Sequence, residues 1–474
     1  MIRPLDRSTP TGLFVRLLRL GLVPLFLFAA ADLAATGSDE LIEPEKEYRS
    51  FTLENGLEVV VVENPLAPIA TVELAVRNGS FTEGPEYAGL SHLYEHMFFK
   101  GNETYPLSQR FLNYLSEIGA IWNATTREEV VYYYFTLPSL NLEAGMELMA
   151  NTIQTPLFDS LELARERLVV IGEFDRHEAS PTFEFSRALD SLTWGNFFTR
   201  KEPIGQRDVI LSATAEQMRE IKRHYYIPNN SLLVVAGDVD SATVHAYAEE
   251  YFLSWESGPD PFVANPIGRP DPLLEKTFVQ VASPLDIVQI THQWHGPSVS
   301  LDPVATYAAD VFIYILQQDQ SRFQQALVES GLCQGASFSY YTQNYVGPIS
   351  VSITTTPEKA EEALRVLKRE IAAFDDPGYV TEEELETAKS ILRVLHLYDV
   401  EETSEWSHTI GFWWSTTGGL DYFRNYLDNL RKVDEQDIID FIGTYVTDKN
   451  YAMAVASNKA NLQRMNLTPE KALW

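Results

Sequence analysis

The stretch 89-GLSHLYEHMFFKG-101 places two histidines and a glutamate within five positions, among apolar neighbours. If the stretch is helical, residues three and four apart share a face, so His92, Glu95 and His96 project into the same space. Two neutral imidazoles at this spacing can both bind one Zn²⁺ at about 2.0–2.1 Å. The carboxylate on the same face then lies close enough to serve a water molecule. The spacing therefore predicts part of a catalytic zinc site, which also needs a third protein ligand and an open fourth position.

A second stretch carries two glutamates at helical spacing. In 161-LELARERLVVIGEFDRHE-178, Glu166 and Glu173 are seven residues apart. Seven residues are two turns of an α-helix, so both carboxylates project from one face. The order of residues in the first stretch is the reverse of the common His-Glu-x-x-His zinc helix and matches that of the inverzincins. Together the two stretches favour an inverzincin peptidase.

At this point the sequence resembles the pitrilysin and insulinase family of metallopeptidases, which includes the mitochondrial processing peptidases. In that family the inverted motif is followed by a Glu-x(6)-Glu helix, and here Glu173 stands 77 residues after His96. The resemblance covers about residues 47 to 457 and is stronger in the first half. Its flanking segments are FKGNETYP after the motif, GAIWNATT (119–126), EPIGQ (202–206) and YYIPNNSLLVVAGDVD (225–240).

The resemblance implies roles for the residues of both stretches. His92, His96 and Glu173 are expected to bind one Zn²⁺ per chain, and Glu95 is expected to take a proton from the attacking water. Glu166 is expected to accept the free N–H of a histidine ligand. A plain surface carboxylate is the alternative for Glu166.

The segment around Trp122 resembles the edge strand of the family. The resemblance implies that Asn123, Ala124 and Thr125 hold an extended substrate by backbone hydrogen bonds. Binding of this kind favours unfolded peptides and flexible segments.

Three other histidines fit a metal site less well. His292 and His295 are three apart in a strand-like run, where alternation sends them to opposite faces. His177 lies one turn after Glu173, but a fourth protein ligand would close the site to water. We expect none of the three to bind the metal.

The length and element pattern indicate two domains. A chain of 474 residues exceeds what one core usually organises. The stretch 49–64 predicts two strands joined at Asn55-Gly56, because this dipeptide tolerates the positive φ of a tight hairpin turn. The order of elements in the second half repeats that of the first. Five prolines between 256 and 275 indicate a connector. We predict a zinc-binding peptidase domain at 47–255, a linker at 256–275 and a homologous domain without zinc ligands at 276–474.

The family resemblance adds a fold to this division. It implies an α+β fold of two homologous domains, each a mainly antiparallel sheet backed by helices, which face each other as a clam-like chamber.

The first residues differ from the rest of the chain. Four arginines precede the apolar run at 20–31, which is too short to span a bilayer comfortably. We predict a signal peptide at 1–31, followed by an acidic spacer at 32–46, and hence a periplasmic or secreted bacterial protein. Cleavage after 33-LAA-35 and retention as an uncleaved anchor are alternatives. After removal of the signal we expect no stable membrane span.

Charge and cysteine content exclude some classes of function. The formal net charge of -31 argues against nucleic acid as a partner, because phosphate binding requires clustered Lys and Arg. Cys333 is the only cysteine, so an intrachain disulfide is impossible.

One feature of the family pattern is missing. Active single-chain or homodimeric members resemble one another in the second domain, where an Arg and a Tyr seven positions later stabilise the oxyanion. If one missing residue is allowed, the aligned positions here are Val328 and Gln334. We therefore expect a sister subunit to supply this pair in a heterodimer. A second domain that closes over the substrate without polar help is the competing interpretation.

Three hypotheses follow for the function. The leading hypothesis is a secreted zinc-dependent endopeptidase that hydrolyses peptides or flexible polypeptide segments as the zinc-bearing subunit of a heterodimer. The alternatives are a catalytically silent structural or assembly subunit and a peptide-binding module without turnover. The intact Glu95 favours the enzyme, because a structural zinc has no use for a base beside an open position.

Overall fold

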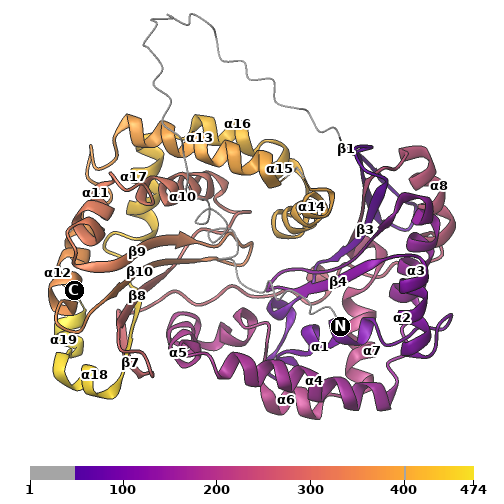
Figure 1. Cartoon of the computed structure of the whole chain (residues 1–474), viewed down its shortest axis with the longest axis horizontal. Coiled ribbons are helices and arrows are strands. Elements are labelled where there is room, and N and C mark those ends of the chain that lie inside the picture. The colour runs from indigo at the N-terminus through magenta and orange to yellow at the C-terminus, as the bar shows by residue number, and fades with distance from the viewer. Residues whose placement is uncertain (1–47, 400–401, 474) are drawn as a thin grey trace, which may run out of the picture. The chain divides into compact units, whose positions relative to one another are not determined.

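The structure is a computed structural model that describes residues 48–399 and 402–473 (Figure 1). The predicted signal peptide at 1–31 and acidic spacer at 32–46 therefore lie outside the described residues. In the part of the chain that is described, no helix combines the length and the apolar character needed to cross a membrane.

The first half builds a six-stranded mixed sheet with the order β1-β2-β6-β3-β5-β4. All neighbouring strands are antiparallel except β2 and β6. The strands are β1 (Tyr48–Thr52), β2 (Glu58–Glu63), β3 (Ile69–Val76), β4 (Ile121–Thr126), β5 (Val131–Pro138) and β6 (Ser231–Gly237).

The predicted strands on either side of Asn55-Gly56 are confirmed, but the connection is longer than a two-residue turn. Thr52 pairs with Glu58, which leaves five residues between the strands. The reason is the Asn55 side chain, whose amide donates to the carbonyls of Phe252 and Trp255 at 2.8 and 3.0 Å. Gly56 follows with a φ of 89°, which a side chain would disfavour.

Helices of the first half cover one face of this sheet. Alternation on β3 directs Val72 and Leu74 into the main core with these helices and Glu73 to the other face. These helices are α1 (Leu90–Phe98), α2 (Ser108–Glu117), α3 (Leu142–Gln154), α4 (Ser160–Glu178), α6 (Arg207–Ser212), α7 (Ala215–Tyr225) and α8 (Ser241–Phe252), whereas α5 (Phe183–Trp194) packs on the sheet of the second half. A short helix α9 (Pro261–Ala264) lies in the proline-rich stretch.

The second half builds a five-stranded sheet with the order β7-β11-β8-β10-β9. Only β7 and β11 are parallel. The same succession of one parallel and three antiparallel pairings occurs in β2-β6-β3-β5-β4, so the predicted α+β fold of two homologous domains is confirmed. The strands are β7 (Thr277–Ala282), β8 (Val288–His295), β9 (Cys333–Tyr340), β10 (Pro348–Thr355) and β11 (Ala452–Ser457).

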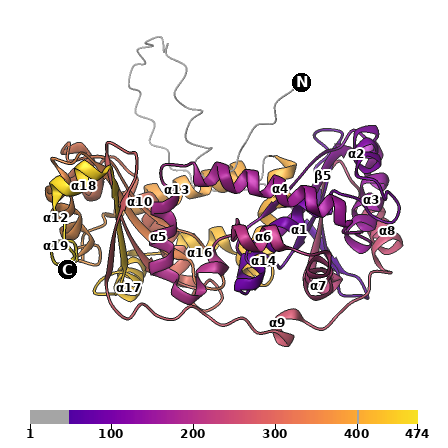
Figure 2. The same ribbon diagram turned by 90° about the horizontal axis from the view of Figure 1, so that it is seen from below.

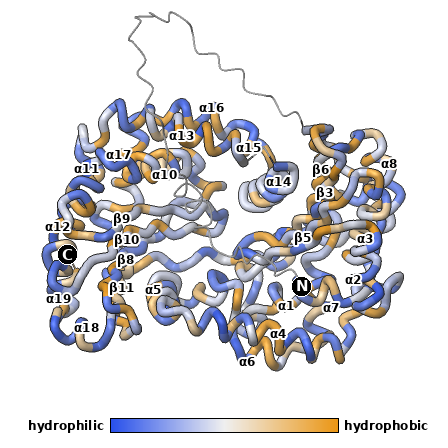
Figure 3. Tube along the Cα trace, viewed as in Figure 1, coloured by the Kyte–Doolittle hydropathy of each residue, from blue (hydrophilic) through white to orange (hydrophobic). Residues whose placement is uncertain are grey.

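A second core lies between this sheet and its own helices. Apolar runs follow strands such as β3 and β6, whereas most helices alternate polar and apolar residues (Figure 3). The helices are α10 (Pro303–Leu316), α11 (Arg322–Gln324), α12 (Ala360–Ile371), α13 (Glu382–Asp399), α14 (Thr403–Thr417), α15 (Asp421–Arg424), α16 (Tyr426–Lys432), α17 (Glu435–Tyr445), α18 (Lys459–Met465) and α19 (Pro469–Ala472).

Two helices pack on the sheet of the opposite half (Figures 1 and 2). From the second half, α14 buries Trp406, Ile410 and Trp414 against β2, β5 and β6. From the first half, α5 buries Phe185 and Leu189 against β11. Each sheet is therefore covered by its own helices on one face and by one helix of the other half on the opposite face.

Candidate zinc site

The start of α1 is fixed by glycine and by a buried glutamate. Gly89 has a φ of 94°, and a Cβ there would lie 2.9 Å from the carbonyl oxygen of Ile204. The Glu83 carboxylate accepts hydrogen bonds from the backbone N–H groups of Gly89 at 2.7 Å and Ser91 at 2.6 Å. Burial raises the pKa of Glu83 to about 7. These contacts satisfy N–H groups that a helix start otherwise leaves without partners.

The apolar face of α1 determines where its polar residues point. Leu90, Leu93 and Met97 lie in the main core. Because helical residues three and four apart share a face, the opposite face presents His92, Glu95 and His96, as predicted.

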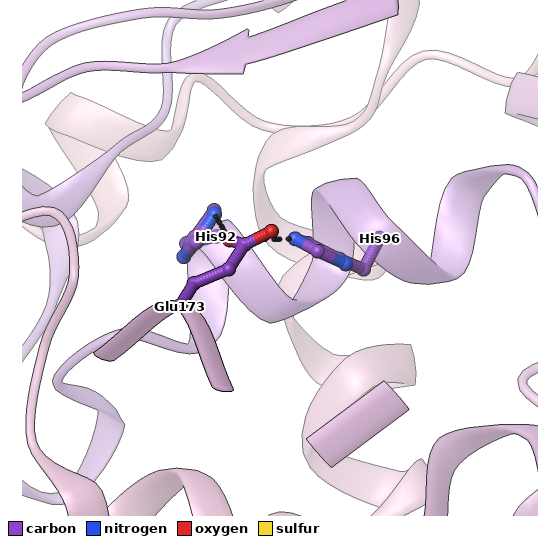
Figure 4. Close-up of side chains that lie close together, drawn as sticks. All are labelled: His92, His96 and Glu173. Carbon is purple, nitrogen blue, oxygen red and sulfur yellow. Dashed lines mark ion pairs between the residues drawn. The ribbon is translucent and has the colours of Figure 1, made fainter. Parts of the chain in front are cut away.

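Helix α4 brings Glu173 to this face of α1 (Figure 4). Its Oε2 atom lies 3.5 Å from Nε2 of His92 and 3.5 Å from Nε2 of His96. The three candidate ligand atoms all lie within 4.8 Å of one another. Among the residues that the structure describes, no other group of His, Cys, Asp and Glu has this geometry.

The distances between the candidate ligand atoms fit a tetrahedrally coordinated cation. Ligand atoms about 2.0–2.1 Å from a shared tetrahedral ion are roughly 3.3–3.5 Å apart. The two observed distances of 3.5 Å match this value and exceed the usual length of an N–H···O bond. Two imidazoles and one carboxylate are also the ligand set of catalytic zinc sites. The residues present therefore fit zinc.

The two imidazoles have different surroundings. Burial, together with the neighbouring His96, lowers the pKa of His92 to about 3. Burial also favours neutral His96, but the carboxylates of Glu166 and Glu173 outweigh burial and raise its pKa to about 9. Because only a neutral imidazole binds a metal, binding at His96 would release a proton.

Glu166 lies beside His96, as the sequence predicts. Its Oε2 atom is 3.2 Å from Nδ1 of His96, and its Oε1 atom is 2.8 Å from Nζ of Lys100. Burial would raise the pKa of Glu166, but His96 and Lys100 hold it below its usual value. The surface alternative for Glu166 does not fit its exposure of 8%.

Glu95 is held by Thr126, a residue outside both sequence motifs that the sequence did not predict. The hydroxyl of Thr126 donates to Oε2 of Glu95 at 2.5 Å. Burial raises the pKa of Glu95, although His96 and Thr126 oppose this rise. A raised pKa suits a carboxylate that must accept a proton near neutral pH.

Strand β4 forms one edge of the first sheet, where it pairs with β5. Its predicted substrate-binding residues alternate, with Asn123 exposed, Ala124 buried and Thr125 half-buried. A further strand can add to this edge through its backbone groups.

The two positions aligned with the missing Arg-Tyr pair have different surroundings. Val328 lies in a π-helical turn (Gln325–Glu329) and packs on the second core, whereas Gln334 lies exposed on β9. A different Arg-Tyr contact joins the two halves, because Nη1 of Arg127 lies 3.4 Å from the hydroxyl of Tyr341. Because the two residues are 214 positions apart, the sequence does not reveal their contact.

The three other histidines considered in the sequence are not part of the group formed by His92, His96 and Glu173. His292 is buried in the second half beside Trp294 and Tyr451. His295 points to the other face of β8, where it stacks on Trp194 and contacts the carbonyl of Thr193 at 2.7 Å. His177 is exposed on α4.

Two family models match the chain. The model described as "Insulinase (Peptidase family M16)" matches residues 58–201, and "Peptidase M16 inactive domain" matches residues 212–392. Together they cover more than half of the 474 residues.

Similar proteins carry protease names. The chain is 26% identical over 407 residues to an uncharacterized zinc protease of Rickettsia felis, covering 84% of this chain and 94% of that protein. It is 23% identical over 359 residues to the uncharacterized zinc protease YmxG of Bacillus subtilis, covering 75% and 85%. The periplasmic protease PqqL of Escherichia coli has a similar fold, with a TM-score of 0.76 and 18% identity over 90% of this chain and 49% of that one. The chain belongs to the pitrilysin and insulinase family of metallopeptidases, peptidase family M16.

Proposed function

We propose that this chain is a zinc-dependent endopeptidase that hydrolyses peptides or flexible polypeptide segments. One observation carries the proposal: the ligand atoms of His92, His96 and Glu173 lie within 4.8 Å of one another, beside Glu95 on the same helix face. The zinc protease names of the relatives support it.

In this proposal His92, His96 and Glu173 would hold one zinc ion, which would supply Lewis acidity for the activation of water and the polarisation of a peptide carbonyl. Glu95 accepts the proton of the attacking water and passes it to the leaving amine. The hydroxyl of Thr126 keeps the Glu95 carboxylate oriented towards that water.

The substrate is proposed to add to the edge of β4 at Asn123, Ala124 and Thr125. Backbone hydrogen bonds along a strand recognise extended chains with little regard to their side chains. Most strands of a folded domain are already paired with neighbours, so we infer a preference for unfolded or flexible segments.

A sister subunit is part of the same proposal. Val328 has no side-chain donor, and the neutral amide of Gln334 can donate a hydrogen bond but lacks the positive charge of Arg. We infer that a second chain, without zinc ligands, supplies the pair in a heterodimer. A periplasmic or secreted location is inferred from residues 1–31 and is supported by the fold similarity to a periplasmic protease.

A catalytically silent subunit is the second candidate. The match of residues 212–392 to a domain described as inactive favours it. A half-buried Glu95 that is hydrogen-bonded beside the metal ligands argues against it, because a structural zinc needs no base.

The proposal is tested by Glu95→Gln in the purified chain, assayed with fluorogenic peptides in the presence and absence of the candidate sister chain. We expect Glu95→Gln to keep its zinc and to lose cleavage. Cleavage at the wild-type rate by Glu95→Gln would show that another group is the base. Zinc binding without cleavage by the wild type under both conditions would support the silent subunit.

A further inference from the structure

We propose that Lys100 is a positioning residue of the zinc site, which acts through Glu166 on the ligand His96. The inference rests on the proposed function of the site. It assigns a role to a residue that is neither a metal ligand nor part of the inverted motif.

Lys100, Glu166 and His96 form a continuous chain of polar contacts. Nζ of Lys100 lies 2.8 Å from Oε1 of Glu166, whose Oε2 lies 3.2 Å from Nδ1 of His96. The opposite side of the same imidazole, Nε2, faces Glu173 at 3.5 Å. Lys100 and Glu166 are 25% and 8% exposed, so the pair is largely shielded from solvent.

This chain of contacts determines which nitrogen of the His96 ring carries the proton and which one faces Glu173. A carboxylate at Nδ1 accepts the ring N–H there, which leaves the lone pair of Nε2 directed at the ligand face. Lys100 occupies the second carboxylate oxygen of Glu166. Two opposed contacts fix both the position and the rotation of the carboxylate, whereas the contact with His96 alone would leave it free to turn.

His92 provides an internal comparison. Its Nε2 also lies 3.5 Å from Glu173, but its Nδ1 is buried without a hydrogen-bond partner among the described residues. The site therefore holds one ligand ring through Glu166 and Lys100 and the other through packing alone. We infer that Lys100 contributes to zinc affinity through His96 and leaves His92 unaffected.

The test measures zinc affinity by competition with a chelating dye, for the wild type, Lys100→Met and Lys100→Arg. Loss of an outer partner of a ligand typically weakens metal binding about 10- to 100-fold. We expect a loss in this range for Lys100→Met and near wild-type affinity for Lys100→Arg, which keeps the charge. Lys459→Met, which changes an exposed lysine of α18, is the control and should bind zinc like the wild type.

A double variant separates positioning from a general effect on folding. If Lys100 acts through Glu166, Lys100→Met should weaken zinc binding no further in a Glu166→Gln background. Additive losses, or wild-type affinity in Lys100→Met, would overturn the inference. If Lys100→Met does not fold, the zinc affinity of Lys100→Gln is measured in its place, with the same expected loss. A wild-type chain that binds no zinc would instead overturn the proposed function.

Discussion

Thr126 illustrates at the scale of single residues how the site depends on groups outside the motif. Its hydroxyl donates to the proposed base Glu95 at 2.5 Å from the end of β4. A hydrogen bond to a charged group is worth about 1.5–3 kcal/mol, which corresponds to roughly 10- to 100-fold in rate. We expect Thr126→Val to lower kcat by this factor with unchanged zinc affinity, measured by steady-state kinetics and zinc titration.

Thr126→Ser is the matched control, because it retains the hydroxyl. It should keep most of the activity. Equal kcat values for Thr126→Val and the wild type would show that this hydrogen bond does not orient the base.

The sequence predicted the residues of the site that belong to short motifs. Helical spacing brought His92, Glu95 and His96 together, and the family resemblance added Glu173 and Glu166. Thr126 and Lys100 could not be predicted, because neither has a distinctive spacing. Their contacts depend on how β4 and α4 pack against α1, and packing is set by the whole core rather than by local pattern.

Among the elements, α10 is the helix of the second half whose place in the order of elements corresponds to that of α1. It contains no His and no Glu, and its Asp310 accepts a hydrogen bond from the hydroxyl of Tyr426 on α16 at 2.7 Å. Burial raises the pKa of Asp310 from 3.8 to about 7. The folded protein therefore keeps this proton over a pH range in which the unfolded chain has released it.

The sign of this shift gives a prediction for Asp310→Asn. The contribution of Asp310 to stability is fully present below about pH 4 and is lost as the pH rises through about 7. The wild type should therefore lose about 1–3 kcal/mol of unfolding free energy between pH 5 and pH 8 that Asp310→Asn does not lose. Denaturant unfolding at both pH values measures this difference.

The exposed Asp421 supplies the control, because its carboxylate is 94% accessible. Asp421→Asn should show the same change in unfolding free energy between the two pH values as the wild type. If Asp310→Asn also shows the same change as the wild type, Asp310 does not titrate as described.

Elements with clear local patterns were predicted well, including β2, α1 and α4. The repeat of the element order is confirmed by the two sheets. The π-helical turn at Gln325–Glu329 was not predicted, since its side-chain spacing resembles that of an α-helix. Nor did the sequence indicate that α5 and α14 pack on the opposite sheets, because an amphipathic helix does not specify which apolar surface it will cover.

At the scale of the whole described chain, buried polar contacts tie the halves together. Nδ1 of His408 on α14 contacts Oε2 of Glu73 on β3, which is fully buried. Burial raises the pKa of Glu73. Burial alone would lower the pKa of His408, but the Glu73 carboxylate outweighs this effect and raises the pKa of His408. Glu129 adds a second connection by accepting the backbone N–H groups of Asn344 and Tyr345 at 2.7 and 2.8 Å.

Removing one partner of the Glu73 and His408 pair should be costly. We expect His408→Ala to lower the free energy of unfolding by about 3–5 kcal/mol, because it leaves a buried carboxylate without its partner. Glu73→Gln in the same chain should restore part of this loss. Chemical denaturation of the single and double variants measures both effects.

His245→Ala serves as the control, because that histidine is 46% exposed. It should change stability little. A stability of His408→Ala within about 1 kcal/mol of the wild type would show that the contact does not hold α14 on the first sheet.

The proposed function depends on three side chains meeting around one zinc ion, and the zinc content of the protein tests this most directly. The metal content of the wild type and of Glu173→Gln is measured after dialysis against a weak chelator. Wild-type chain should retain one zinc per molecule, and Glu173→Gln, which keeps the shape of the side chain, should retain almost none. Equal zinc content in the two proteins, or none in the wild type, would contradict the proposed site.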